Sequence, residues 1–103
     1  MPRLIRASGK SELGPGDMKV VEDGDERILL VNIENSFYAV SELCTHSDAP
    51  LSEGFLEDGH IECPWHVSRF NLMTGEVSEP PAIDPLKVYT VKVEGEDIFV
   101  EIP

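Results

Sequence analysis

The stretch that organises this chain is Cys44-Thr45-His46 followed, after sixteen residues, by Cys63-Pro64-Trp65-His66. Cys44 and Cys63 are the only cysteines in the chain, and each has a histidine close behind it. Thiolate sulfur and imidazole nitrogen are the protein ligands of zinc and of many iron centres. The two short motifs therefore predict a four-ligand metal site, with one cysteine and one histidine on each of two loops.

Iron–sulfur clusters take thiolate and imidazole ligands, and three other interpretations of the motif pair compete with such a cluster. A structural zinc site uses the same ligands, but zinc motifs usually place two cysteines about two to four residues apart, and each motif here mixes the two types. A Cys44–Cys63 disulfide would leave both histidines without a role. A cysteine nucleophile with a histidine base would need only one of the two pairs. His60, the third histidine, has no cysteine partner and is expected on the surface of a strand.

Length and composition predict one small domain over residues 1–103. The chain has 103 residues, of which 41% are hydrophobic, and a bound metal would add folding free energy. The sequence contains no run of about 18 apolar residues, so it predicts no transmembrane helix. Residues 1–10 lack the apolar segment of a signal peptide, and we therefore expect a cytoplasmic protein with reduced thiols.

Charge limits the classes of partner. The chain has 20 acidic and 8 basic residues, a net charge of −12, and no basic stripe. This balance disfavours nucleic acid and anionic membranes as partners. We expect a monomer that docks transiently on basic patches of larger proteins, because complementary charge raises the encounter rate. Acidity that serves only to keep the chain in solution is the simpler alternative.

Alternating apolar residues and closely spaced turn signals predict an all-β protein, with the cleanest alternation at Ile98, Val100 and Ile102. Strands are expected at residues 3–7, 18–22, 27–34, 37–40, 55–56, 60–62, 69–73, 76–78, 86–94 and 97–102. One helical turn is expected at residues 11–13, and prolines 80, 81 and 85 predict a rigid loop. The expected architecture is an antiparallel sandwich or barrel, into which a small metal-binding subdomain is inserted at about residues 41–81.

The chain resembles the Rieske ferredoxins of bacterial aromatic-ring dioxygenase systems. The resemblance rests on residues 44–54, 61–66, Phe70, Thr74-Gly75, Pro80-Pro81 and 85–89, and it extends over essentially the whole chain. It implies a Rieske-like fold and one 2Fe–2S cluster. It further implies that Cys44 and Cys63 hold one iron and that His46 and His66 hold the other.

The resemblance also implies a function in aromatic compound degradation. Such proteins carry single electrons from a flavin-containing, NAD(P)H-dependent ferredoxin reductase to a terminal ring-hydroxylating oxygenase. The chain would then be an electron carrier and not an enzyme, because His60 alone cannot supply the two histidines of a mononuclear iron site. The alternative is the small Rieske subunit of an assimilatory nitrite reductase.

A low reduction potential is expected within the Rieske range of roughly −150 to +300 mV. Respiratory Rieske proteins carry a further cysteine in each motif, and these two form a disulfide that this chain lacks. They also donate hydrogen bonds to the cluster from a serine and a tyrosine. Ser68 and Phe70 occupy those positions here, so at most one of the two donors remains. Fewer hydrogen bonds to sulfur destabilise the reduced state and lower the potential.

Two positions depart from the family pattern, since Val67 replaces a common glycine and Asn71 a frequent aspartate. Val67 puts the local conformation of the second loop in question, because glycine is favoured where backbone passes close to a cluster. Around the histidines we expect an apolar collar made of Pro50, Pro64, Trp65, Pro80 and Pro81, although Trp65 packing over the cluster is an equal alternative. Acidic docking contacts are expected from Asp48, Glu53 and Glu79, whereas Arg69 is expected in a structural ion pair.

Overall fold

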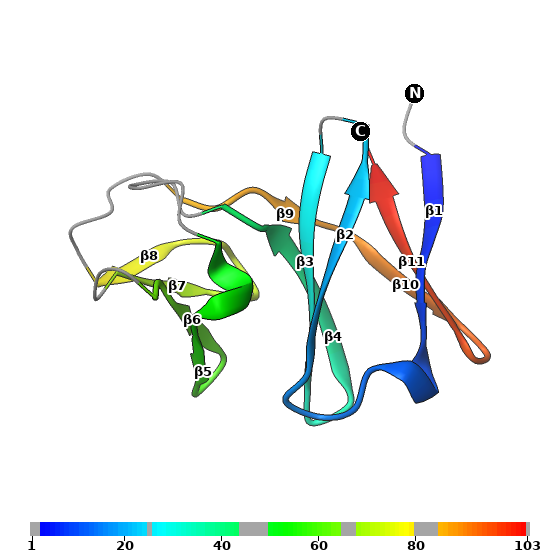
Figure 1. The fold of residues 1–103 in the computed structure, drawn as a ribbon, viewed down its shortest axis with the longest axis horizontal. Coiled ribbons are helices and arrows are strands. Elements are labelled where there is room, and N and C mark those ends of the chain that lie inside the picture. Colours follow the sequence, from blue (N-terminus) through cyan, green and yellow to red (C-terminus); the bar gives the residue numbers. More distant parts are fainter. Residues whose placement is uncertain (1–2, 25, 44–49, 65–67, 80–84, 103) are drawn as a thin grey trace.

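The computed structural model describes residues 3–24, 26–43, 50–64, 68–79 and 85–102 (Figure 1). These residues form three antiparallel sheets and no α-helix, which confirms the predicted all-β class. Their helical content is limited to two single turns, η1 (Lys10–Glu12) and η2 (Leu51–Glu53). The first of these turns lies one residue before the turn expected from the sequence.

Two of the sheets pack against each other, and the third lies beside them. The first has the strand order β1-β11-β10 and contains β1 (Arg3–Gly9), β10 (Val91–Glu94) and β11 (Asp97–Ile102). The second has the order β2-β3-β4-β9 and contains β2 (Met18–Asp23), β3 (Glu26–Ile33), β4 (Ser36–Ser41) and β9 (Val88–Tyr89). The third is a meander of β5 (Phe55–Glu57), β6 (His60–Glu62), β7 (Arg69–Asn71) and β8 (Val77–Glu79). The meander is inserted between β4 and β9, and Figure 1 shows it to one side of the other two sheets.

Strand β3 is buried on both of its faces. Ile28 and Leu30 pack with residues of β1 and β11, whereas Leu29 and Val31 pack with residues of the short-stranded β5–β8 meander, the small sheet. Successive side chains of a strand point to opposite faces, so an uninterrupted apolar run is what a strand between two cores requires. The run from Ile28 to Val31 is fully buried and therefore joins the two hydrophobic clusters of the molecule.

The stretch at residues 86–94, expected as one strand, is two strands in different sheets. Strand β9 pairs with β4 and strand β10 pairs with β11, and the chain leaves one sheet for the other at Thr90. The carbonyl of Thr90 accepts a hydrogen bond of 2.9 Å from the Glu101 N–H, which holds the crossing point against β11. The single-strand prediction was wrong here, because an apolar run does not reveal which sheet each of its halves joins.

Two turns differ slightly from expectation. The β3–β4 hairpin turns at Glu34 and Asn35, with φ values of 50° and 70°, so Ser36 already belongs to β4. Positive φ at both central residues is typical of the tight turn that matches the twist of a hairpin. Strand β7 ends at Asn71 instead of Met73, because the Asn71 Oδ1 accepts the N–H groups of Met73 and Thr74 and turns the chain. The expected proline loop lies outside the described residues, apart from Pro85.

Candidate metal centre

The two ends of the first ligand loop, Leu43 and Pro50, are held together, and we call this closed base of the loop its neck. Leu43 and Pro50 form an antiparallel bridge, and the Leu51 N–H donates a 2.8 Å hydrogen bond to the carbonyl of Glu42. After the neck, η2 turns the chain, and the Gly54 N–H donates to the Leu51 carbonyl at 2.9 Å. The chain therefore leaves β4 after Ser41, and Leu51 brings it back to Glu42.

The second ligand loop has a neck of the same kind. The Cys63 N–H donates a 2.9 Å hydrogen bond to the carbonyl of Ser68, directly between β6 and β7. The side chain of Cys63 is buried, with 1% exposed, and Ser68 is fully buried. A thiol sheltered at the base of a loop is placed where a soft metal needs its thiolate ligand.

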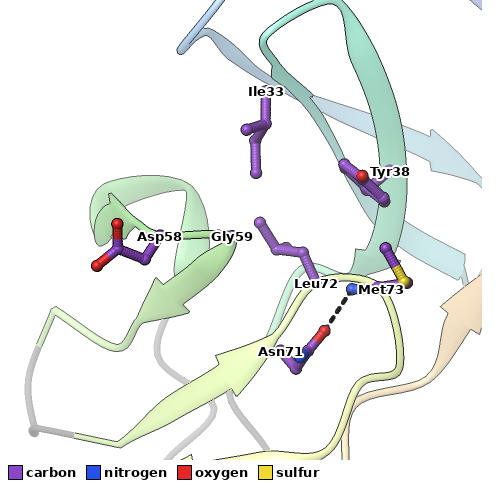
Figure 2. A pocket seen from close by; sticks show the side chains of 7 residues that line it. All are labelled: Ile33, Tyr38, Asp58, Gly59, Asn71, Leu72 and Met73. Atoms are coloured by element: carbon purple, nitrogen blue, oxygen red, sulfur yellow. Dashed lines mark hydrogen bonds between the residues drawn. The ribbon is translucent and has the colours of Figure 1, made fainter.

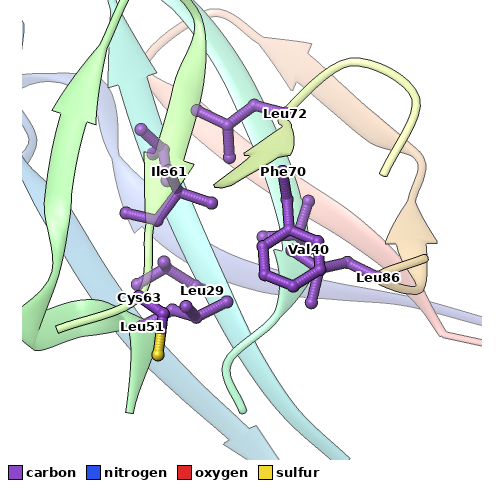
Figure 3. Close-up of a cluster of buried hydrophobic side chains, with 9 residues drawn as sticks. Leu29, Val40, Leu51, Ile61, Cys63, Phe70, Leu72 and Leu86 are labelled. Carbon is purple, nitrogen blue, oxygen red and sulfur yellow. The ribbon is translucent and has the colours of Figure 1, made fainter. Parts of the chain in front are cut away.

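The two necks lie against each other. Leu51 of the first and Cys63 of the second belong to one hydrophobic cluster with Leu29 and Ile61. In Figure 3 the sulfur of Cys63 points away from the other side chains drawn. Gly54 lies so close to β6 that a Cβ built on it would be 2.0 Å from the carbonyl oxygen of Glu62. The fold therefore brings two loops that are distant in sequence to one end of the small sheet.

The structure describes one of the four predicted ligands directly. Cys63 occupies the position just given, while Cys44, His46 and His66 lie outside the described residues. Asp48, Trp65, Val67, Pro80 and Pro81 lie outside them as well. Within the described residues no group of three His, Cys, Asp or Glu side chains is arranged to hold a metal. The residues that are described fit a 2Fe–2S cluster, since they provide a buried thiol, a buried hydroxyl and two adjacent loop necks.

Phe70 and Arg69 follow the second loop on β7 and have separate structural roles. Phe70 is fully buried in the cluster between the small sheet and β3, where its ring offers no hydroxyl. Arg69 lies on the opposite face, and its guanidinium is 3.8 Å from the Glu57 carboxylate and 3.4 Å from the Glu57 carbonyl. This geometry agrees with the structural ion pair expected for Arg69. His60 lies on β6, where its Nδ1 is 2.8 Å from the carbonyl oxygen of Asp58.

The outer face of the small sheet is acidic next to the loop necks. The strand register aligns Phe55, Glu62, Arg69 and Glu79 in one row across the sheet, and Cys63 directly follows this row. Phe55 is 61% exposed, and Glu79 is exposed as well. Because Arg69 already pairs with Glu57, the carboxylates of Glu62 and Glu79 leave this row with a negative charge.

Glu42 is a buried charged residue that the sequence interpretation did not single out. Its side chain is 1% exposed, and its Oε1 accepts a 2.6 Å hydrogen bond from the hydroxyl of Ser52. Strand alternation provides the missed signal, because Glu42 lies two residues beyond Val40 and so on the same, buried face.

Two cavities lie at the other end of the small sheet, beside the β5–β6 turn. One has a volume of about 200 Å³ and is lined by Tyr38, Leu72 and Met73, which Figure 2 shows. The other, of about 220 Å³, lies near Pro15 and Leu56, and both are lined by Ile33, Asp58 and Gly59. The β5–β6 turn and the loop necks are at opposite ends of the same hairpin. These cavities are therefore separate from the predicted metal centre.

A polar cluster links β9 to the start of β3. The carboxylate of Glu26 accepts hydrogen bonds from the Tyr89 hydroxyl at 2.5 Å and from the Lys87 ammonium at 3.1 Å. These bonds, first that from Tyr89, lower the pKa of Glu26. Burial, followed by the neighbouring Glu26 carboxylate, raises the pKa of the Tyr89 phenol. The cluster thus fastens β9 to β3, two strands away in the same sheet.

An all-β fold with two adjacent loop necks, at sequence motifs that each contain one cysteine and one histidine, defines an iron–sulfur protein of the Rieske class. The family model described as "Rieske [2Fe-2S] domain" matches residues 4–90. The chain belongs to this family and carries one 2Fe–2S cluster. No helix among the described residues is long and apolar enough to span a membrane.

Comparison with known proteins defines the branch of the family. The ferredoxin component of biphenyl 2,3-dioxygenase from Rhodococcus jostii (strain RHA1) is 39% identical, covering 96% of this chain and 92% of the relative. The ferredoxin subunit of 3-phenylpropionate/cinnamic acid dioxygenase from Escherichia coli (strain K12) is 48% identical, covering 74% and 73%. The chain is a ferredoxin of the ring-hydroxylating dioxygenase type, an electron carrier.

Solved structures show the same fold. The structure described as a complex of reduced oxygenase and oxidized ferredoxin in carbazole 1,9a-dioxygenase matches with a TM-score of 0.90 and 34% identity, covering 94% of this chain and 91% of that chain. A putative nitrite reductase small subunit from Mycobacterium tuberculosis matches with a TM-score of 0.89 at 22% identity, covering 100% and 97%. The second likeness shows the fold alone. It therefore carries no support for a nitrite reductase function.

Proposed function

We propose that the chain holds its cluster with Cys44 and Cys63 on one iron and His46 and His66 on the other. We also propose that the whole chain, residues 1–103, is one cytoplasmic, monomeric Rieske domain whose cluster-binding part spans about residues 41–81. The observation that carries the ligand proposal is the pair of adjacent necks, with the buried Cys63 thiol at one of them. The bound cluster would accept and release a single electron, and the protein residues hold and shelter it.

The proposed donor is a flavin-containing, NAD(P)H-dependent ferredoxin reductase, and the proposed acceptor is a terminal ring-hydroxylating oxygenase in aromatic compound degradation. Support for the acceptor comes from the carbazole dioxygenase system, in which a similar ferredoxin forms a complex with the oxygenase. The net charge of −12 supports transient docking on basic surfaces of both partners.

The proposed docking surface lies at the neck end of the small sheet. Glu53 in η2 and Glu79 at the end of β8 are exposed there, and Phe55 adds an exposed aromatic ring. Charged groups at the rim of an interface mainly change the association rate and its salt dependence. We therefore expect these carboxylates to speed the encounter with a basic partner surface.

The ligand proposal is tested by EPR of the dithionite-reduced protein together with metal analysis. The wild-type protein is expected to contain iron and to give the rhombic signal of a mixed-ligand 2Fe–2S cluster. Cys63→Ser is expected to lose that signal, and so are His46→Ala and His66→Ala. Stoichiometric zinc without an EPR signal would contradict the proposal, as would an unchanged spectrum in these three variants.

The docking proposal is tested by the rate of electron transfer from the reduced protein to its oxygenase. Reversing charge in Glu53→Lys and Glu79→Lys together is expected to slow transfer about tenfold at low ionic strength, because electrostatic steering is lost. The difference should shrink as salt is raised, since the Debye length falls to about 3 Å at 1 M. The double variant Glu34→Lys and Glu94→Lys, which changes two exposed positions away from the loop necks by the same net charge, is the matched control. Equal slowing in the control would show that only net charge matters.

A further inference from the structure

Glu42 is built into the base of the first ligand loop through its backbone. Its N–H donates a 3.0 Å hydrogen bond to the Arg27 carbonyl, and its own carbonyl accepts the 2.8 Å bond from Leu51. The next residue, Leu43, forms the bridge that closes the loop neck. Glu42 is therefore the last residue bonded to β3 before the loop begins.

The Glu42 side chain spans the neck. Its Oε1 accepts the 2.6 Å hydrogen bond from Ser52, which lies in η2 immediately after the loop. Its Oε2 is buried and has no hydrogen-bond partner in the part of the chain that the structure describes. The carboxylate thus joins the chain before the loop to the chain after it by a direct bond between side chains.

A carboxylate buried at this position reduces the stability of the core. Val40, two residues earlier in β4, is fully buried, as is the neighbouring Leu51. A buried polar group that is incompletely hydrogen-bonded reduces stability, and an apolar residue of similar volume would often be tolerated better. Packing alone therefore does not explain why Glu42 is present.

We propose that the Glu42–Ser52 hydrogen bond is a brace that positions the first ligand loop on the cluster. This inference rests on the proposed function, in which that loop carries Cys44 and His46. Residues that orient metal ligands without touching the metal typically change metal affinity by about 10–100-fold when they are replaced. Glu42 and Ser52 are positioning residues in this sense. Their bond restricts the distance between the two ends of the loop.

The experiment compares cluster release from the loaded wild-type protein, Ser52→Ala, Glu42→Ala and the double variant under an excess of an iron chelator. Each single variant is expected to lose its visible absorbance about tenfold faster than wild type. The double variant should be no faster than the quicker single one, because all three lack the same bond. Ser78→Ala, which removes an exposed hydroxyl from β8, is the control and should match wild type.

EPR of the reduced variants measures the g-values of the cluster, which would stay unchanged if Glu42 and Ser52 had a purely structural role. Shifted g-values in Ser52→Ala, with the far-UV circular dichroism of wild type, are expected if the brace sets ligand geometry. If Glu42→Ala does not fold, Ser52→Ala against Ser78→Ala decides the question.

Three results would overturn the brace. They are release rates equal to the Ser78→Ala control, unchanged g-values in Ser52→Ala, and additive effects in the double variant. A wild-type protein without any Rieske signal would overturn the proposed function as well. A normal wild-type signal with an inert Ser52→Ala would overturn the brace alone.

Discussion

Replacing Gly54 by alanine tests whether the contact between the two loop necks holds the metal centre together. Gly54 has φ of −85°, a backbone conformation open to alanine, so the substitution introduces no backbone strain of its own. The added Cβ would lie 2.0 Å from the Glu62 carbonyl oxygen and 3.1 Å from that of Leu51. Both neighbours are backbone atoms, which cannot move aside as a side chain would.

The size of the effect follows from that contact. Real Cβ atoms do not approach within 3.0 Å of such a neighbour, so the end of the first loop must move away from β6 by about 1 Å. Overpacking of this kind costs about 1–3 kcal/mol. For a domain of about 100 residues, 2 kcal/mol corresponds to a fall in Tm of about 8–16 °C. Because the displaced segment adjoins Cys63, iron content should fall together with Tm.

The assay is thermal unfolding of the loaded protein with iron content measured in parallel. Gly14→Ala is the matched control, since its Cβ would meet only the end of the exposed Asp17 side chain, at 3.2 Å. We expect Gly54→Ala to lose both stability and iron while Gly14→Ala stays near wild type. Equal Tm and iron content in the two variants would refute the packing of one neck against the other.

Three further predictions test the core, the potential and the pH dependence. Phe70→Tyr should raise the midpoint potential by about 60 mV. A hydrogen bond from the added hydroxyl that stabilises the reduced cluster by about 1.4 kcal/mol shifts a one-electron couple by about 59 mV. An unchanged potential in a redox titration would contradict this. Leu29→Ala should lower the free energy of unfolding by about 2–5 kcal/mol, because the Leu29 side chain is fully buried beside the necks. Val93 is 44% exposed, so Val93→Ala should have little effect in the same thermal unfolding experiment. Glu26→Gln should lower Tm at pH 7, and the difference from wild type should shrink as pH falls below about 4.5, since a carboxylate with a lowered pKa stabilises the fold only while it is ionised. A pH-independent difference would show that the Glu26 charge is not involved.

Local sequence signals were sufficient for most of the strands. The alternation of Ile98, Val100 and Ile102 predicted a half-buried strand, and all three side chains are buried in β11. The Asp58-Gly59 turn signal likewise predicted the β5–β6 hairpin. These features depend on neighbours in the chain, so a pattern of a few residues contains the necessary information. The metal-ligand proposal is local in the same sense, because each motif spans only three or four residues.

Other features depend on residues that are far apart in the sequence. The break at Thr90 follows from which sheet each half of residues 86–94 joins, and that is decided by β4 and β11. In the same way, the hydrogen bond from Ser52 shows that the buried Glu42 spans a loop neck.

The motif at Cys44 and Cys63 by itself determined the chemistry expected of this protein, because ligand types and their spacing are properties of the chain. Only the tertiary structure decided how the two loops are held. Leu51 of the first neck and Cys63 of the second share one hydrophobic cluster with Leu29 of β3, and the bond across the first neck joins Glu42 to Ser52, ten positions later. A motif of three or four residues contains neither of these contacts.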